Sequence, residues 1–110
     1  MKIELAKTEI IHFVGIGGIG MSGLALIMKG LGFKIQGSDI SSNKNIERLK
    51  KNKIKVYISH NKKNIQKSTI LVISSAIKQS NSEIIKAKEK QLPIYKRGDM
   101  LAHVVSLLKR

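Results

Sequence analysis

A glycine-rich octapeptide, GIGGIGMS at residues 15–22, constrains the fold of this 110-residue chain more than any other stretch. It follows the apolar run Ile10–Val14 and leads into a segment, 21–31, in which apolar residues recur at helical spacing. Each glycine loses more conformational freedom on folding than any other residue, so four glycines in six residues require a structural reason. The usual reason is a sharp strand–helix turn that brings phosphates close to free helix N–H groups. The octapeptide therefore predicts a binding site for a nucleotide diphosphate.

Strand-like and helix-like segments alternate along the rest of the chain. β-Branched and apolar runs predict five strands, at 10–14, 34–39, 55–58, 69–73 and 94–95. Helical patterns lie between and after them, at 21–31, after the capping residues 41–43, from a capping box at 80–83, and at about 99–108. Residues 64–68 are expected to form a polar connection with one helical turn. The alternation predicts one α/β domain with a Rossmann-like, doubly wound, mainly parallel five-stranded sheet and helices on both faces.

Apolar periodicity also predicts which helix side chains pack inward. The helix after the capping box is expected to bury Ile84, Ile85 and Ala87. The last helix is expected to place five apolar residues on one side: Met100, Leu101, Val104, Val105 and Leu108.

Polar residues follow several of the predicted strands at the point where each strand ends. Ser38 and Asp39 end the second strand, His60 follows the third, and Ser74 and Ser75 follow the fourth. Ligands of doubly wound sheets bind beyond the carboxyl ends of the strands, where the strand order reverses. These side chains and the glycine loop are therefore expected to converge on one rim.

The loop itself fits more than one kind of nucleotide. Gly15, Gly17 and Gly20 match the dinucleotide fingerprint, and Asp39 lies 19 residues after Gly20, placed to hold a ribose hydroxyl. The spacing also fits an ATP-binding P-loop, but Met21 occupies the lysine position, which argues against ATP hydrolysis here. A nucleotide-diphosphate domain, the NAD-binding domain of an oxidoreductase and a stand-alone nucleotide sensor therefore all remain open.

Composition narrows the function classes. The net charge of +14 comes largely from scattered lysines, which are 18 of the 21 basic residues. This pattern favours a general bias in amino-acid composition over specific nucleic-acid binding.

Without cysteine the chain has no disulfide or thiolate chemistry, and its three histidines lack metal-ligand spacing, so we expect no metal site. Ser22 has no neighbouring base in the sequence and lacks a nucleophile-elbow pattern, so we do not expect it to be a catalytic serine. Residues 10–28 are uncharged, but their clustered glycines argue against a membrane span or a targeting signal.

Four blocks of the chain resemble, in order, the N-terminal domain of the Mur ligase family of peptidoglycan synthesis. They are HFVGIGGIGMSGLA at 12–25, GSD at 37–39, SSAI at 74–77 and RGDMLA at 97–102. The resemblance covers essentially the whole chain. It implies that residues 1–110 are one UDP-sugar-binding N-terminal domain of a longer cytoplasmic ligase, whose ATP-binding and C-terminal domains would lie elsewhere in the parent chain.

The resemblance also implies a substrate and a set of contacts. The substrate would be UDP-N-acetylmuramate, which the parent enzyme would join to L-alanine with ATP and Mg²⁺, while this chain alone would bind it without catalysis. Asp39 would lie towards the ribose and uracil, His60 would reach the phosphate or sugar, and Arg97 would sit near the rim. The uridine would be lined by Ser74, Ser75 and Ala76. The diphosphate would face the backbone of Gly15, Ile16, Gly17, Gly18, Ile19, Gly20, Met21 and Ser22.

Overall fold

The computed structural model describes residues 3–109, in which five strands alternate with four α-helices and one 3₁₀ helix. The strands are β1 (Ile10–Val14), β2 (Lys34–Asp39), β3 (Lys55–Ile58), β4 (Ile70–Ile73) and β5 (Ile94–Lys96). The helices are α1 (Ile19–Gly30), α2 (Lys44–Lys51), η1 (Lys62–Ile65, the 3₁₀ helix), α3 (Ser82–Glu89) and α4 (Arg97–Leu108). The predicted alternation of strands and helices is confirmed.

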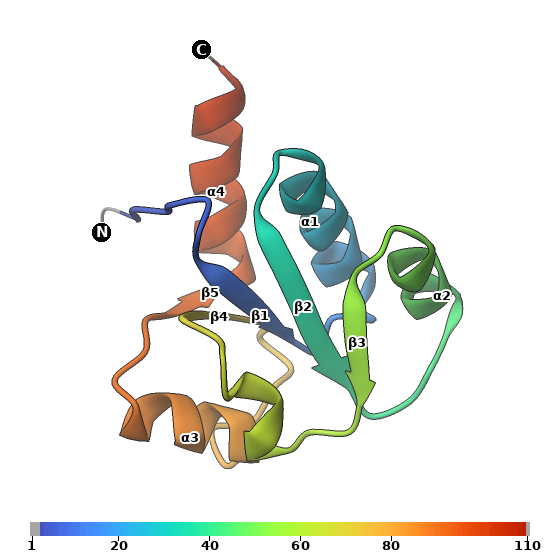
Figure 1. Cartoon of the computed structure of the whole chain (residues 1–110), viewed down its shortest axis with the longest axis vertical. Coiled ribbons are helices and arrows are strands. Elements are labelled where there is room, and N and C mark those ends of the chain that lie inside the picture. Colours follow the sequence, from blue (N-terminus) through green and yellow to red (C-terminus); the bar gives the residue numbers. More distant parts are fainter. Residues whose placement is uncertain (1–2, 110) are drawn as a thin grey trace.

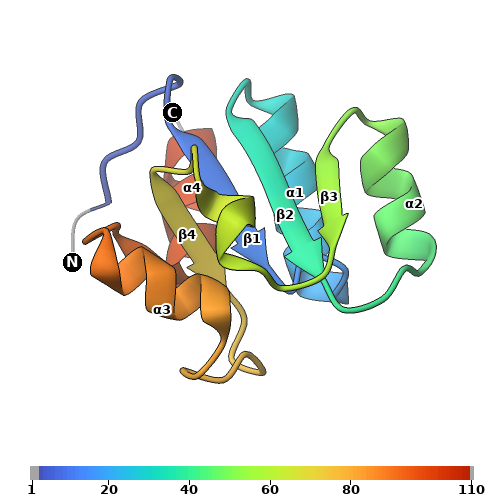
Figure 2. The same ribbon diagram turned by 60° about the horizontal axis from the view of Figure 1, so that its bottom comes forward.

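All neighbouring strands are parallel, in the order β3-β2-β1-β4-β5 (Figure 1). Helices α1, α2 and α4 cover one face of the sheet, which we call the α1 face. Helices α3 and η1 cover the other, the α3 face (Figure 2). The sheet is therefore doubly wound, as predicted. Its order reverses between β1 and β4, so the carboxyl ends of these two strands flank the position where such sheets bind ligands.

Each face of the sheet has its own apolar core. On the α1 face the largest cluster surrounds Phe13 of β1 and includes Met21, Leu24, Met28, Ile46, Leu49, Met100 and Val104. On the α3 face a smaller cluster joins β1 and β4 to η1 and α3 through Val14, Leu71, Ile73, Ile65, Ile84 and Ala87. Because both of their faces are covered, β1 and β4 are largely buried, which explains why their sequences are so continuously apolar.

Two helices begin earlier than the sequence pattern predicts. α1 begins at Ile19, so the end of the octapeptide is the first turn of the helix rather than part of the loop. α4 begins at Arg97, directly after β5, instead of at residue 99. Both shifts bring the backbone of predicted site residues into helix N-termini.

Three apolar side chains predicted to pack inward are exposed instead. Ile85 is 48% exposed, because consecutive residues point about 100° apart around a helix and Ile84 already faces the sheet. Val105 and Leu108 are 39% and 56% exposed. The end of α4 projects beyond the sheet, so no strand lies beneath its last turn (Figure 1).

The connection from β3 to β4 contains one helical turn, as expected, but the turn begins two residues earlier and the connection is partly buried. It contains η1 at Lys62–Ile65, and Asn64, Ile65 and Ser68 are buried. This segment crosses from one half of the sheet to the other, and so it is packed against α3 rather than lying on the surface.

Within residues 3–109 no helix has the length and apolar character needed to cross a membrane. The uncharged stretch 10–28 is instead divided between β1, the glycine loop and α1.

Candidate functional site

The first half of the glycine loop is folded back onto β2. The N–H groups of Gly15 and Ile16 both donate to the Ser38 carbonyl, at 2.9 and 3.0 Å. Gly15 has a φ of +83°, which side chains disfavour. Ile16 is fully buried over Gly37, where an added Cβ would lie 2.6 Å from the Ile16 side chain. Gly37 is therefore required for the loop to settle on the strand.

Asp39 holds the middle of the loop. Its Oδ2 accepts a hydrogen bond from the Gly17 N–H at 2.8 Å, and its Oδ1 accepts one from the Ile40 N–H at 2.8 Å. The Gly17 carbonyl in turn accepts from the side-chain amides of Asn43 and Asn45, at 3.2 and 2.9 Å. The carboxylate thus supports the loop at the rim, and its predicted contact with a ribose stays a prediction.

The start of α1 leaves three backbone donors unused. The first of its amides to donate in the helical pattern is that of Ser22, to the Gly18 carbonyl at 2.8 Å. The N–H groups of Ile19, Gly20 and Met21 form no hydrogen bond within residues 3–109. No acidic residue lies in the first helical turn. Free N–H groups at a helix N-terminus attract anions, so this end of α1 suits a phosphate group.

The octapeptide contributes backbone rather than side chains to this surface. Met21 and Ser22 are both 3% exposed and face the interior, and the Ser22 hydroxyl donates to the Ile19 carbonyl at 3.2 Å. Gly18, Ile19 and Gly20 are exposed. Since Met21 is part of the apolar core, its position cannot supply the cation that a P-loop places there.

Arg97 lies directly over the start of α1. An added Cβ on Gly20 would lie 3.1 Å from the Arg97 guanidinium carbon, so glycine leaves the space that this side chain fills. Arg97 is the first residue of α4, and contacts between α1 and α4 bring the two helices together. The structure therefore places a cation beside the start of α1, and the predicted contact of Arg97 with a ligand stays a prediction.

The loop after β4 closes the other side of the site. An added Cβ on Gly15 would lie 3.1 Å from the Ile77 side chain and 3.7 Å from the Ser74 hydroxyl. Ser74 therefore faces the start of the glycine loop, while Ser75 and Ala76 are exposed beside it. The carboxyl ends of β1 and β4 thus bring predicted residues from distant parts of the sequence together.

A buried carboxylate, Glu83 of α3, lies at the centre of a polar network on the α3 face. Its Oε1 accepts hydrogen bonds from His12 Nε2 at 2.8 Å and from the Ser38 hydroxyl at 2.6 Å. Its Oε2 accepts from the Asn61 N–H at 3.1 Å and from the Asn64 side-chain amide at 2.7 Å. One side chain thus connects α3 to β1, β2 and the η1 region.

The network determines the charge of Glu83. Burial raises the pKa of this carboxyl, but the hydrogen bonds that it accepts from His12, Ser38 and Asn64 outweigh the effect of burial. The pKa of Glu83 is lowered from its ordinary 4.5, so the group is ionised at neutral pH. His12 is fully buried and its Nδ1 accepts a hydrogen bond from the Gln36 side chain at 2.7 Å, as expected for a structural histidine.

His60 joins this network from the loop after β3. Its Nδ1 lies 3.0 Å from the Ser38 hydroxyl and 3.8 Å from Glu83 Oε1. Its side chain is 16% exposed, so the ring lies between the buried network and solvent. The structure connects it to β2 beside the glycine loop, and its contact with a ligand stays a prediction.

The inward-facing role of Glu83, which borders the candidate site, is not predicted by the sequence. The pattern predicts it as part of a capping box, whereas the N-cap of α3 is Asn81, whose side chain accepts from the Glu83 N–H at 2.9 Å. The Glu83 carboxylate is turned inward instead. The one available signal was His12, since a histidine within a buried apolar strand requires a polar partner.

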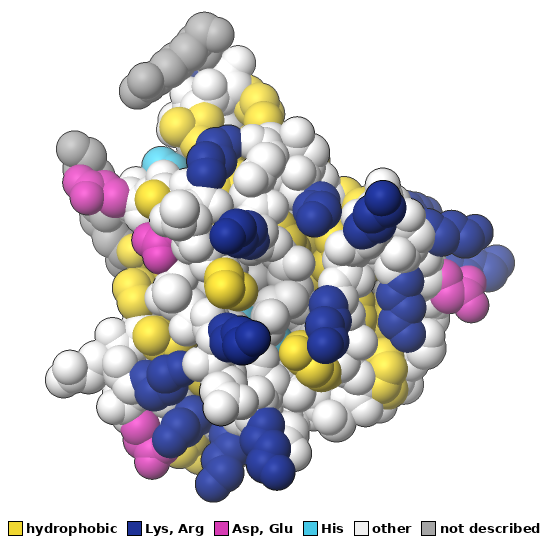
Figure 3. Space-filling model, in the orientation of Figure 1, with side chains coloured by type: hydrophobic (Ala, Val, Ile, Leu, Met, Phe, Trp, Pro, Cys, Tyr) yellow, Lys and Arg dark blue, Asp and Glu magenta, His cyan; other side chains and the backbone are white. Residues whose placement is uncertain are grey.

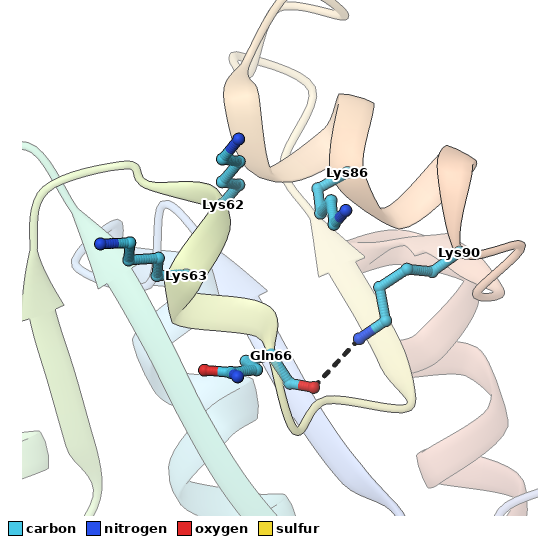
Figure 4. A pocket seen from close by; sticks show the side chains of 5 residues that line it. All are labelled: Lys62, Lys63, Gln66, Lys86 and Lys90. Atoms are coloured by element: carbon cyan, nitrogen blue, oxygen red, sulfur yellow. Dashed lines mark hydrogen bonds between the residues drawn. The ribbon is translucent and has the colours of Figure 1, made fainter.

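A lysine-lined pocket of about 520 Å³ lies elsewhere on the α3 face, between α3 and η1 (Figure 4). Of its lining residues, Lys90 donates to the carbonyls of Ile65 and Gln66 at the end of η1, a structural role. On the face seen in Figure 3, basic side chains are spread over the surface rather than gathered at one place. The pocket therefore reflects the lysine-rich composition and lies outside the candidate site.

Among residues 3–109, no group of three or more histidine, aspartate or glutamate side chains is arranged to hold a metal ion. The residues at the rim are instead backbone donors, hydroxyls, one cation and one carboxylate that the loop already uses. This donor set suits an anionic, polar ligand.

Comparison with known proteins identifies the family. The model of the Mur ligase family, catalytic domain, matches residues 10–108. The chain belongs to the Mur ligase family. The resemblance inferred from its four sequence blocks is confirmed.

Several individual Mur ligases are similar to the chain. The UDP-N-acetylmuramate–L-alanine ligase of Pelagibacter ubique is 78% identical over 109 residues, which are 99% of this chain and 24% of that protein. The enzyme of the same name from Bartonella bacilliformis is 55% identical over 96% of this chain and 22% of its own length. The crystal structure of the UDP-N-acetylmuramate-alanine ligase of Thermotoga maritima superposes with a TM-score of 0.81 at 35% identity, covering 92% of this chain and 23% of that one. The chain thus spans less than a quarter of the length of these Mur ligases.

Proposed function

We propose that this chain is the domain that holds UDP-N-acetylmuramate in a ligase that adds L-alanine to it. The observation that carries the proposal is the anion-binding arrangement at the switch between β1 and β4. There the three unused N–H groups of Ile19, Gly20 and Met21 lie beside the Arg97 guanidinium. A diphosphate carries charge that both kinds of donor stabilise. The names of the similar ligases point to the same substrate.

The remaining rim residues would orient the rest of the ligand. The uridine would lie against Ser74, Ser75 and Ala76, with Asp39 towards its ribose. His60 would contact the phosphate or the sugar. The exposed backbone at Gly18 and Gly20 would allow the ligand to approach closely, whereas the N–H groups of residues 15–17 are already bonded to Ser38 and Asp39.

Ligation chemistry would belong to other parts of the parent protein. The family reaction uses ATP and Mg²⁺, but the glycine loop does not fit ATP, because the P-loop lysine position is occupied by the buried Met21. We therefore assign no step through ATP to this chain and expect it to bind the substrate without catalysis. As the N-terminal part of such a ligase, residues 1–110 would form one cytoplasmic domain.

Calorimetric titration tests the proposal. The chain should bind UDP-N-acetylmuramate, and Arg97→Gln should weaken binding about ten- to hundredfold, because a charge-assisted hydrogen bond is lost. Arg48→Gln is the matched control, since Arg48 lies on the exposed side of α2 and should leave the affinity unchanged.

The same titration with NAD tests the alternative of an oxidoreductase cofactor domain. The glycine fingerprint alone fits that function equally well. Binding of NAD without binding of UDP-N-acetylmuramate would contradict the proposed function.

A further inference from the structure

Gly17, in the middle of the glycine loop, is held through both of its backbone polar groups. Its N–H donates to the Asp39 carboxylate, and its carbonyl accepts from the side-chain amides of Asn43 and Asn45, at 3.2 and 2.9 Å. A carbonyl oxygen has two lone pairs, and these two amides use both of them. The Gly17 carbonyl is therefore closed to a ligand and points toward the start of α2, where both asparagines lie.

The partners of the two asparagines fix the orientation of their amides. The Asn43 oxygen accepts from the Ile46 N–H at 2.9 Å as the N-cap of α2, which leaves its nitrogen for Gly17. Asn45 faces a carbonyl, which can only accept, so its nitrogen also points at the loop. An added Cβ on Gly17 would lie 2.7 Å from Asp39 Oδ2 and 3.1 Å from Asn43 Nδ2. This glycine of the fingerprint thus makes room for the side chains that hold it.

The direction of the Gly17 carbonyl determines the direction of the next N–H. In a trans peptide these two groups point in opposite directions, so the Gly18 N–H points away from α2, where it reaches the Gly15 carbonyl at 3.3 Å. Gly18 is the N-cap of α1, and the unused N–H groups of residues 19–21 follow it directly. A peptide turned the other way would place a carbonyl oxygen, which repels an anion, on the side where the Gly18 N–H now lies.

We propose that Asn43 and Asn45 are positioning residues, which hold the Gly17–Gly18 peptide so that its carbonyl faces away from an anion bound at the start of α1. This role rests on the proposed function, because that function supplies the anion, the diphosphate of a UDP-sugar. Neither asparagine needs to touch the ligand. Both act through one peptide unit on the N-cap that precedes the unused N–H groups. Their loss should therefore weaken anion binding without a matching loss of stability.

The chain offers a matched control for Asn45→Ala in Asn52→Ala. Each substitution removes a side-chain amide that donates to a backbone carbonyl, from Asn45 to Gly17 at 2.9 Å and from Asn52 to Arg48 at 2.8 Å. Asn45 lies in the first turn of α2, whereas Asn52 is the C-cap at the other end of the same helix. A merely structural role predicts the same result for both.

Asn43→Ser is a second variant at the loop. Serine still offers an oxygen to cap α2, but it lacks the amide that reaches the Gly17 carbonyl. The helix should therefore keep its N-cap while the loop loses one of its two donors.

The ¹³C chemical shift of the Gly17 carbonyl, measured on the 110-residue chain without ligand, tests the contact itself. This signal moves upfield when a hydrogen bond to the oxygen is lost. It should move in Asn45→Ala and in Asn43→Ser and stay unchanged in Asn52→Ala. An unchanged signal in both loop variants would overturn the proposal.

Calorimetric titration with UDP-N-acetylmuramate and with inorganic pyrophosphate tests the effect on binding. Asn45→Ala and Asn43→Ser should each weaken the binding of both anions about fivefold, the scale of one hydrogen bond. Asn52→Ala should bind as the wild type does. Thermal unfolding should show Asn45→Ala to be no less stable than Asn52→Ala, because alanine is the better helix former at a position within α2. A loss of affinity that only follows a loss of stability would contradict the positioning role.

The two anions separate this role from the proposed function. Equal affinities of the wild type, Asn45→Ala and Asn52→Ala would overturn the positioning role and leave the proposed function intact. Binding of pyrophosphate at the amides of residues 19–21 without binding of UDP-N-acetylmuramate would refute the proposed function. The pyrophosphate affinities of the variants would then still decide the role of the asparagines. Binding of neither anion would refute both.

Discussion

Ser38 uses its two oxygen atoms for two different structures. Its carbonyl accepts the hydrogen bonds of Gly15 and Ile16 and holds the glycine loop. Its hydroxyl lies between Glu83 and His60 in the buried network. A single buried residue at the end of β2 therefore joins the phosphate-facing loop on one side to the titratable groups on the other.

Glu83→Gln should reduce stability in a pH-dependent way. Because the pKa of Glu83 is lowered on folding, its ionised form stabilises the fold above the ordinary value of 4.5, and this stabilisation is lost as pH falls through the folded-state pKa. At neutral pH the substitution should lower the free energy of unfolding by about 2 kcal/mol, the worth of hydrogen bonds to a charged group.

Urea unfolding from about pH 7 to about pH 3.5 measures this difference, which should shrink at the acid end. Glu89→Gln provides the control, because Glu89 is 62% exposed and its pair with Lys86 spans 3.8 Å. That change should stay within about 0.5 kcal/mol. A constant difference between wild type and Glu83→Gln at all pH values would contradict the prediction.

Gly37→Ala should destabilise the chain by about 1–3 kcal/mol, because the added Cβ has no space. It would lie 2.6 Å from the Ile16 side chain and 2.7 Å from the Phe13 carbonyl, which belongs to the adjacent strand and cannot move away. Gly23→Ala, on α1 with no atom within 4 Å of the new Cβ, should instead stabilise by up to about 1 kcal/mol. Thermal unfolding compares the two, and equal melting temperatures would contradict the packing argument.

At the scale of elements, the 3₁₀ helix η1, in the connection from β3 to β4, is held in place by the neighbouring helix α3. Lys90 at the end of α3 donates to the carbonyls of Ile65 and Gln66, at 3.2 and 3.1 Å. The Ile65 carbonyl also accepts from the Ser68 N–H at 3.0 Å, so Lys90 adds a second donor there and supplies a donor to the Gln66 carbonyl at the end of the 3₁₀ turn. The lysine therefore acts as a cap supplied by a neighbouring element.

Lys90→Ala should lower the free energy of unfolding by about 1 kcal/mol and increase hydrogen exchange in η1 more than in α1. Lys67→Ala is the control, since Lys67 is exposed on the same segment. Unaltered exchange in η1 would show that Lys90 leaves the turn unaffected.

Local patterns predicted most of the elements but little of the network. β1 and β4 were recognisable because strands buried on both faces are continuously apolar, and the octapeptide stood out by its glycines. The partners of Glu83 lie 71, 45 and 19 residues away, at His12, Ser38 and Asn64. No local periodicity encodes such contacts, and the sequence pattern around this carboxylate predicts only a capping role. The sequence likewise does not predict that Asp39 supports the loop, because an acidic residue at the end of a strand can accept a hydrogen bond either from a ligand or from a loop N–H group.

At the scale of the whole molecule, the rim lies on the seam between two half-sheets. β1, β2 and β3 carry the glycine loop, Asp39 and His60, whereas β4 and β5 lead into Ser74 and Arg97. A ligand at this seam would contact both halves. The same molecule carries a net charge of +14, which creates an attractive field for an anionic ligand well beyond the contacts of the rim.

Association with UDP-N-acetylmuramate should therefore slow as salt is added. Between about 0.05 and 0.5 M ionic strength the association rate should fall severalfold. The reason is that the Debye length falls from more than about 10 Å to less than that, so the lysine charges no longer attract a ligand before it reaches the surface. The dissociation rate should change less. Stopped-flow measurements separate the two, and a salt-independent association rate would exclude steering by the lysines.

The way the glycine loop rests on β2 has a consequence for protein engineering. Its shape depends on the missing side chain of Gly37, the carbonyl of Ser38 and the carboxylate of Asp39, none of which belongs to the octapeptide. Transplanting residues 15–22 alone into another α/β scaffold would transfer the glycines without the surface that shapes them. The portable unit is discontinuous, consisting of the octapeptide together with the last three residues of the neighbouring strand.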